Sequence, residues 1–166
     1  DPAAWRWDDA THGTHVAGSI AAKHDGVGVD GVNPTLRIAA INVASRNGGF
    51  FYPEYIVCGF VWAAEHGISV TNGSYYVDPW KYWLPNDPEQ AAGQEAVQRA
   101  VDYATSKDVI NVVAAGNFST DLDNLPTTDD SAPGGPSRGE KAVSLLNRHY
   151  AFDSARREFR IRYFYE

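Results

Sequence analysis

Three short apolar runs that alternate with two helical segments constrain the fold of this chain most strongly. The runs cover residues 36–43, 68–72 and 109–115, and each fits a strand that is buried on both faces of a sheet. Between them lie segments 53–66 and 88–106, whose apolar residues recur at helical spacing. Strands that alternate with helices in this way form βαβ units. The sequence therefore predicts an α/β fold with a mostly parallel sheet and helices on both of its faces.

The ends of the two helices are marked by residues that favour helix termini. Pro53 suits the first turn of the first helix, and Gly67 suits the stop at its C-terminal end. The helix over 88–106 has acidic residues towards its start and Lys107 at its end, as the helix dipole prefers.

The polar residues after the strands are the first place to look for a site. In parallel sheets, ligands bind at the carboxyl ends of the strands. Three such ends are predicted here, at residues 42–49, 72–76 and 114–117.

A histidine motif precedes the first apolar run. His12-Gly13-Thr14-His15-Val16-Ala17-Gly18 opens a helix expected over 12–23, with Thr11 as its N-cap. A histidine in the first turn is fixed by the backbone yet faces outward, so His12 suits a general base. A structural histidine and a zinc site using His12, His15 and His24 are the alternatives. The H-E-x-x-H pattern of zinc proteases is absent, and no cysteine lies nearby.

A second motif, Val112-Val113-Ala114-Ala115-Gly116-Asn117, ends the third run. Together the two motifs resemble the histidine motif and the V-A-A-G-N block of the subtilisin-like serine proteases. The resemblance covers residues 1–130 and implies a subtilisin-like fold. It also implies that His12 is the catalytic general base and that the Asn117 side chain donates to the oxyanion of the tetrahedral intermediate. A fixed donor of this kind lowers the barrier by roughly 3 kcal/mol.

The resemblance further implies a cleft for an extended polypeptide substrate. Segment 74–76 would wall the pocket for the residue before the scissile bond, with 115–116 opposite. Segment 48–50 would form a second edge, so that the peptide adds as a strand between two edges. Tyr76 stands where the family usually has glycine. The residues implied to bind substrate are Gly48, Gly49, Ser74, Tyr75, Tyr76, Ala115 and Gly116.

Two members of the catalytic triad have no recognisable match. The family needs an aspartate to orient the histidine and a serine to attack the substrate. No apolar strand precedes Asp1, Asp8 or Asp9, and no G-T-S-x-A stretch is present. Ser137 lies in a G-x-S-x-G match, but the buried strand that should precede such an elbow is missing, which favours a chance match. The fold is therefore expected to be incomplete, with flanking segments or a second chain supplying the aspartate and serine.

Two functions follow from these observations. The first is a serine endopeptidase that hydrolyses peptide bonds through an acyl-enzyme, although this polypeptide alone is expected to have little turnover. The second is a non-catalytic, protease-like module that keeps the cleft as a peptide-binding surface, because loss of a triad member does not abolish binding.

Charge and hydropathy exclude other classes of partner. The net charge is -7, and it divides into +3 over residues 138–166 and -10 over the rest of the chain. An acidic body argues against nucleic acid, whose phosphates attract Lys and Arg. No uncharged run of 18 or more apolar residues is present, so no membrane partner is expected.

The segment after residue 130 differs from the body of the chain. The sequence divides into a subtilisin-like portion over 1–130 and an atypical segment over 131–166, with short strands expected at 141–146 and 159–165. No cofactor or metal is expected. The carboxylates of residues 121–130 could hold a structural calcium ion, but their spacing does not match an EF-hand loop.

The numbers of methionine and cysteine residues bear on where the protein acts. No methionine is present, including at position 1, which indicates either a removed leader or a piece of a longer chain. Cys58 is the single cysteine, so no disulfide can form within the chain. The resemblance implies a secreted, extracellular protein.

Overall fold

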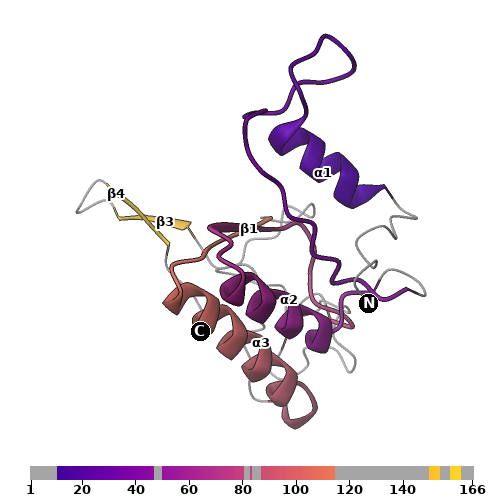
Figure 1. Cartoon of the computed structure of the whole chain (residues 1–166). Coiled ribbons are helices and arrows are strands. Elements are labelled where there is room, and N and C mark those ends of the chain that lie inside the picture. Colours follow the sequence, from indigo (N-terminus) through magenta and orange to yellow (C-terminus); the bar gives the residue numbers. More distant parts are fainter. Residues whose placement is uncertain are drawn as a thin grey trace.

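The computed structural model describes residues 11–46, 50–80, 83 and 87–114, together with the backbone of 150–153 and 158–161. Its elements in chain order are α1 (His12–Ala21), α2 (Pro53–Glu65), β1 (Val70–Gly73), α3 (Pro88–Ser106), β2 (Ile110–Val113), β3 (Tyr150–Asp153) and β4 (Glu158–Ile161) (Figure 1). None of the helices in this described part is long and apolar enough to cross a membrane.

The segment from β1 through α3 to β2 is the predicted βαβ unit. The two strands pair in parallel, with Val70 opposite Ile110 and Gly73 opposite Val113. The parallel pairing of the second and third apolar runs is therefore confirmed. Because the strands are parallel and in register, their carboxyl ends lie at the same edge of the sheet.

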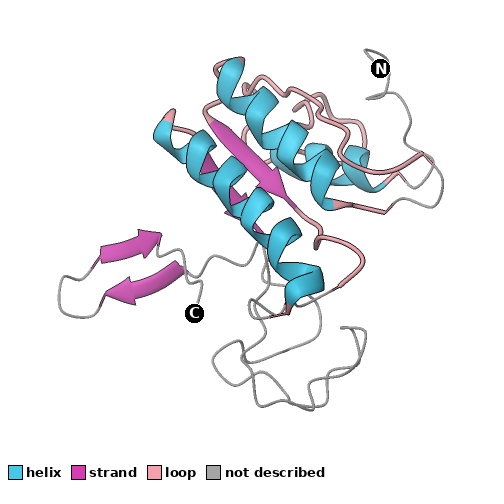
Figure 2. Ribbon diagram, turned by 90° about the horizontal axis from the view of Figure 1, so that it is seen from below, coloured by secondary structure: helices cyan, strands magenta, loops and turns pink. Residues whose placement is uncertain are grey.

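Helices lie on both sides of this two-stranded sheet. α2 and α3 lie side by side against one face, and α1 lies on the opposite side (Figures 1 and 2). Asn111 faces the α3 side, is buried, and donates from Nδ2 to Thr105 Oγ1 at 3.2 Å. Val70 and Ile110 point to the other face and are 53% and 49% exposed. The fold is thus α/β as predicted, with one sheet face left open.

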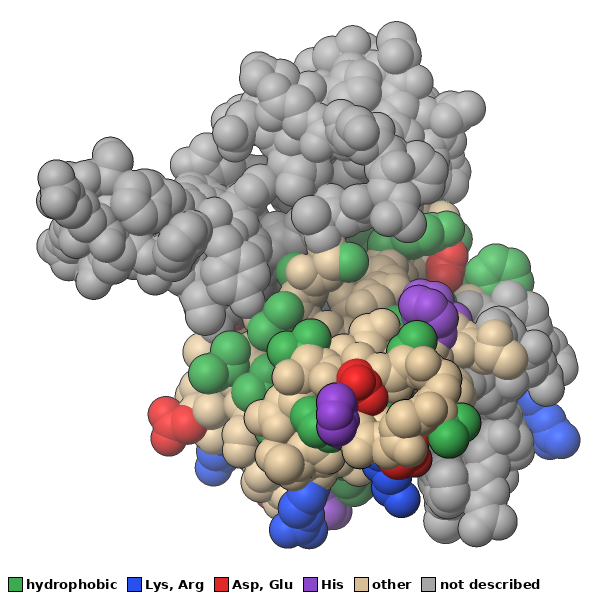
Figure 3. Space-filling view, turned by 90° about the horizontal axis from the view of Figure 1, so that it is seen from above, with side chains coloured by type: hydrophobic (Ala, Val, Ile, Leu, Met, Phe, Trp, Pro, Cys, Tyr) green, Lys and Arg blue, Asp and Glu red, His purple; other side chains and the backbone are tan. Residues whose placement is uncertain are grey.

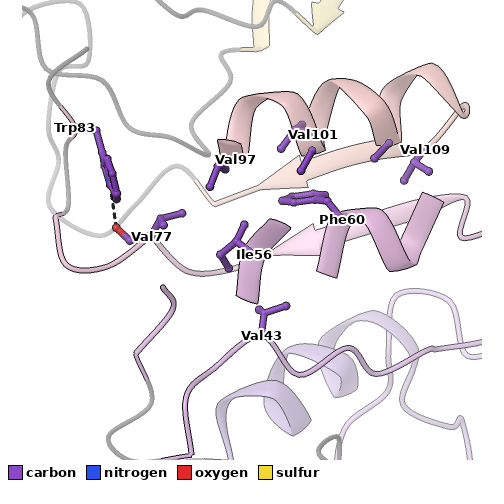
Figure 4. Packing of buried hydrophobic residues seen from close by; sticks show 10 residues of the cluster. Val43, Ile56, Phe60, Val77, Trp83, Val97, Val101 and Val109 are labelled. Carbon is purple, nitrogen blue, oxygen red and sulfur yellow. Dashed lines mark hydrogen bonds between the residues drawn. The ribbon is translucent and has the colours of Figure 1, made fainter. Parts of the chain in front are cut away.

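The hydrophobic core lies between α2, α3 and the sheet. Ile56 and Phe60 of α2 face Val97 and Val101 of α3 (Figure 4). Full burial of each such side chain contributes roughly 1.5–3 kcal/mol. The buried cluster as a whole comprises Val43, Ile56, Phe60, Val77, Trp83, Val97, Ala100, Val101, Ala104 and Val109.

The ends of α2 and α3 confirm the predictions made from proline and glycine. Pro53 begins α2, and Gly67, with a φ of 68°, follows its C-cap. α3 begins at Pro88, and the Asp87 carboxylate caps it by accepting from the Glu89 N–H at 2.9 Å.

The first apolar run is not a strand, which corrects the expectation for residues 36–43. Leu36 and Ile38 are each 50% exposed, and only Val43 is buried at the far end, where it packs near Gly59 of α2. An apolar run forms a strand only where a neighbouring strand satisfies its N–H and C=O groups. Within the described residues, the ladders join only β1 to β2 and β3 to β4.

α1 is two residues shorter than expected, because a returning segment binds the carbonyls at its C-terminal end. The N–H groups of Gly31, Val32 and Asn33 donate to three of these carbonyl oxygens at 2.9–3.1 Å. The acceptors are the carbonyls of Ser19, Ile20 and Ala22. These bonds satisfy groups that every helix end leaves unpaired. The helix therefore ends where the chain turns back on itself.

The C-terminal segment contains one described antiparallel pair. Tyr150 of β3 lies opposite Ile161 of β4. β4 overlaps the strand predicted over 159–165, whereas the strand predicted over 141–146 lies outside the described residues.

Candidate active site

His12 is the first residue of α1, and its side chain is exposed. The helix starts with the His15 N–H donating to the Thr11 carbonyl at 2.9 Å. Thr11 occupies the N-cap position, but it has a left-handed backbone (φ 57°) and makes no side-chain capping bond. The predicted N-cap position of Thr11 is therefore confirmed, although its side chain makes no capping bond. The helix still holds the His12 backbone while the imidazole faces solvent, as a general base requires.

The other histidines give no support to the zinc alternative. His24 lies in the loop after α1 and its Nδ1 is 2.8 Å from an oxygen of Asp30. In the part of the chain that the structure describes, no three His, Cys, Asp or Glu side chains gather into a metal-binding group. Figure 3 shows exposed histidine side chains on the face seen from above, one of them directly beside an acidic side chain.

Two of the three predicted strand ends lie together. Gly73 and Val113 are partners in the ladder, and the Ala114 N–H donates to the Gly73 carbonyl at 3.1 Å. Ser74 follows directly and accepts from the Asn72 side-chain amide at 2.9 Å. Ser74 and Ala114 therefore follow paired strand ends at the same edge of the sheet.

An aromatic pair lies next to this edge. The Tyr75 ring stacks on the Phe51 ring, with centroids 4.7 Å apart and planes inclined by 6°. Burial in this contact raises the pKa of the Tyr75 phenol to about 12, because the charged form loses its hydration. Tyr76 takes no part in this stack and is 46% exposed. The loop after β1 thus presents one packed and one free tyrosine.

Segment 50–51 has its backbone groups already bonded. The Phe50 N–H donates to Ser45 Oγ at 3.1 Å, and the Phe50 carbonyl accepts from the Ser45 N–H at 2.7 Å. The Phe51 N–H donates to Asp78 Oδ2 at 2.7 Å, and the Phe51 carbonyl accepts from the Asp78 N–H at 2.9 Å. The sequence reasoning missed Phe51 and Asp78. They are 27 residues apart, and no local pattern indicates a contact at that separation.

Several predicted site residues lie outside the described part of the chain. Their roles remain predictions, and the acidic residues 121–130, considered above for calcium, also lie outside the described residues. The predicted site residues concerned are Gly48, Gly49, Ala115, Gly116, Asn117 and Ser137.

The fold and the position of the site define an α/β protein whose candidate site residues lie at the carboxyl ends of adjacent parallel strands. The model of the subtilase family of peptidases matches residues 1–143, beyond the limit of 130 expected from the motifs. Fervidolysin of Fervidobacterium pennivorans is 36% identical over 116 residues, which cover 67% of this chain and 15% of that protein. Subtilisin DY of Bacillus licheniformis is 36% identical over 114 residues, covering 69% of this chain and 36% of the relative.

A third relative carries a description of its location. The minor extracellular protease Epr of Bacillus subtilis is 29% identical over 161 residues, which cover 89% of this chain and 24% of that protein. This chain therefore belongs to the subtilase family, the subtilisin-like serine proteases. The matched part covers between 15% and 36% of the length of these three relatives.

Proposed function

We propose that this chain is the part of a secreted serine endopeptidase that carries the general base and the oxyanion donor. The observation that carries the proposal is the in-register pairing of β1 with β2, because it brings the segments after Gly73 and Val113 to one edge. The family motif ends only four residues beyond that ladder, at Asn117. An extracellular location is supported by the relative from Bacillus subtilis, the minor extracellular protease Epr.

In this proposal His12 takes the proton of a serine hydroxyl while the serine oxygen adds to the scissile carbonyl. The Asn117 amide donates to the oxyanion that forms. His12 then returns the proton to the leaving amine as the peptide bond breaks, and water hydrolyses the remaining acyl-enzyme by the same steps. The serine and the aspartate that orients His12 come from flanking segments or from a second chain.

The substrate is an extended polypeptide. Ser74, Tyr75 and Tyr76 line one wall of the pocket, and Ala115 and Gly116 line the other. Tyr76 replaces the glycine usual in the family, so a large and exposed phenol stands at the mouth of this pocket. The pocket is proposed to differ from the family pattern in shape for this reason.

A non-catalytic, protease-like peptide-binding module is the second candidate. The absence of a recognisable triad aspartate and serine from these 166 residues favours it. Binding by the strand edge needs neither residue.

Fluorophosphonate labelling, with the modified serine located by mass spectrometry, tests the proposal. We expect the 166-residue chain alone to remain unlabelled, and the intact source protein to be labelled at a serine outside these residues. His12→Ala should lower kcat of the intact protein by roughly 10⁶-fold, whereas His15→Ala, on the same exposed helix, is the matched control and should not.

Three results would contradict the proposal. An unlabelled and inactive source protein would favour the binding module. Labelling of the isolated chain at Ser137 would assign the nucleophile to this chain. One zinc ion bound per chain and lost in His15→Ala would support the metal alternative.

A further inference from the structure

Successive residues of an extended segment direct their backbone N–H and C=O groups to opposite sides. In segment 50–51 the groups of Phe50 are bonded to Ser45, and those of Phe51 are bonded to Asp78. The N–H and C=O groups of Phe51 therefore point to the loop after β1, where Asp78 lies. A peptide that lies between segment 50–51 and the loop after β1 would need the same N–H and C=O groups of Phe51.

Asp78 engages Phe51 much as a neighbouring strand would. In an antiparallel pair, one residue gives an N–H and accepts an N–H from the residue opposite. Asp78 donates its own N–H to the Phe51 carbonyl at 2.9 Å and uses its carboxylate to accept the Phe51 N–H at 2.7 Å. The carboxylate thus takes the position of a peptide carbonyl. A bond from an N–H to a carboxylate is stronger than one to a neutral carbonyl, so a peptide competes poorly for it.

Packing around these bonds closes the same space. Asp78 is only 7% exposed, and Val77 before it is 2% exposed. The rings of Phe51 and Tyr75 are in offset contact at 4.7 Å, so no third side chain fits between them. The backbone bonds between Phe51 and Asp78 and the stacking of Tyr75 on Phe51 therefore both close the space beside segment 50–51.

We propose that Asp78 is a specificity-determining residue. It hydrogen-bonds the backbone N–H and C=O of Phe51 and so prevents an extended peptide from pairing with segment 50–51. This inference rests on the proposed function, because it assumes that peptide enters beside Ser74–Tyr76. The consequence is that a peptide paired with the predicted edge at 48–50 cannot extend its pairing to Phe51. Removal of the Asp78 carboxylate should free the Phe51 N–H for a peptide.

The test uses the full 166-residue chain and three variants. Asp78→Ala removes the acceptor, and Asp78→Asn keeps an oxygen acceptor without the charge. Asp87→Ala is the matched control, since it also removes a carboxylate that accepts a backbone N–H, at the start of α3. Circular dichroism establishes that each variant is folded, and Asp78→Asn keeps the test decisive if Asp78→Ala does not fold.

Two measurements test separately whether Asp78 protects the Phe51 amide and whether it limits peptide binding. Hydrogen exchange of the Phe51 amide, followed by NMR in chain labelled with ¹⁵N-phenylalanine, should be roughly tenfold faster in Asp78→Ala or more, intermediate in Asp78→Asn and unchanged in Asp87→Ala. The affinity for a dansylated hexapeptide of alternating valine and threonine should rise roughly ten- to a hundredfold in Asp78→Ala and stay at the wild-type value in the control.

Each other outcome overturns either the role of Asp78 or the peptide cleft of the proposed function. Unchanged exchange at Phe51 in Asp78→Ala overturns the role of Asp78. Faster exchange with equal peptide affinity in the wild type and Asp78→Ala also overturns it, while the cleft of the proposed function stands. If no variant binds the hexapeptide although Phe51 exchanges faster, the peptide cleft itself is wrong.

Discussion

At the scale of single residues, Gly31 is required by the close approach of two backbone segments. A Cβ placed there would lie 2.3 Å from the Ala22 nitrogen and 2.5 Å from the Ala21 nitrogen. Backbone atoms at the end of a helix cannot move aside as a flexible side chain can. The returning segment that ends α1 therefore depends on the missing side chain.

We expect Gly31→Ala to destabilise the chain by about 2–3 kcal/mol, because the bonds to the end of α1 must break. Urea unfolding and exchange of the Val32 amide measure this effect. Gly18→Ala is the matched control, since nothing lies within 4 Å of a Cβ at that helical position. The control should gain about 0.5–1 kcal/mol. Equal effects of the two variants would contradict the argument.

Tyr75 should make stability depend on alkaline pH. Its pKa is about 12 in the folded chain and 10.0 for the free side chain, so the folded state keeps the proton between these values. Stability is therefore unaffected below pH 10 and falls as pH rises through 10–12, by about 1 kcal/mol at pH 11. Urea unfolding at pH 9 and pH 11 tests this.

The variant Tyr75→Phe isolates this contribution, because it should lose most of the alkaline dependence. A smaller dependence will remain, since a hydrogen bond to Glu65 also raises the pKa of Tyr103. An identical alkaline loss in the variant and the wild type would show that Tyr75 is not the cause.

At the scale of elements, α3 is fixed at its start by a single side chain. The Asp87 carboxylate satisfies an N–H that the helix cannot, and its negative charge favours the positive end of the dipole. The cap lies directly before Pro88, the first residue of α3. It therefore sets where the long core-facing helix begins.

Replacement of this cap by alanine, Asp87→Ala, should cost about 1 kcal/mol of unfolding free energy. Asp87→Asn keeps a side-chain acceptor and should cost less. Thermal unfolding followed by circular dichroism compares the two. A loss in Asp87→Asn as large as in Asp87→Ala would mean that the capping oxygen is not what matters.

At the scale of the whole molecule, the sheet has one covered face and one open face. Val70 and Ile110 point to the open face and are about half exposed. Adjacent exposed apolar side chains on a sheet favour association with other apolar surfaces. The isolated chain should therefore self-associate.

The double variant Val70→Thr/Ile110→Thr should raise the concentration at which the chain begins to associate in sedimentation experiments. Val32→Thr is the control, because Val32 is 93% exposed and belongs to the segment that returns to the end of α1, not to the sheet. Unchanged self-association of the double variant would show that another surface of the chain mediates it. Cooperative unfolding of a fully monomeric wild-type chain would also count against this expectation.

The sequence by itself determined the elements whose signals are local. Pro53, Gly67 and Asp87 act on the backbone within a few residues, so α2 and α3 could be predicted nearly to the residue. The parallel pairing of β1 with β2 followed because a helix between two apolar runs leaves few other connections. The histidine motif likewise identified the family before any geometry was known.

Only the tertiary structure decided which apolar run has a neighbour and which backbone groups remain free. Residues 36–43 look like a strand in sequence, yet a strand exists only where another chain segment accepts its hydrogen bonds. Phe51 and Asp78 meet across 27 residues, and no periodicity encodes that contact. The family could be read from local chemistry, whereas the closed edge beside the candidate cleft depends on long-range packing.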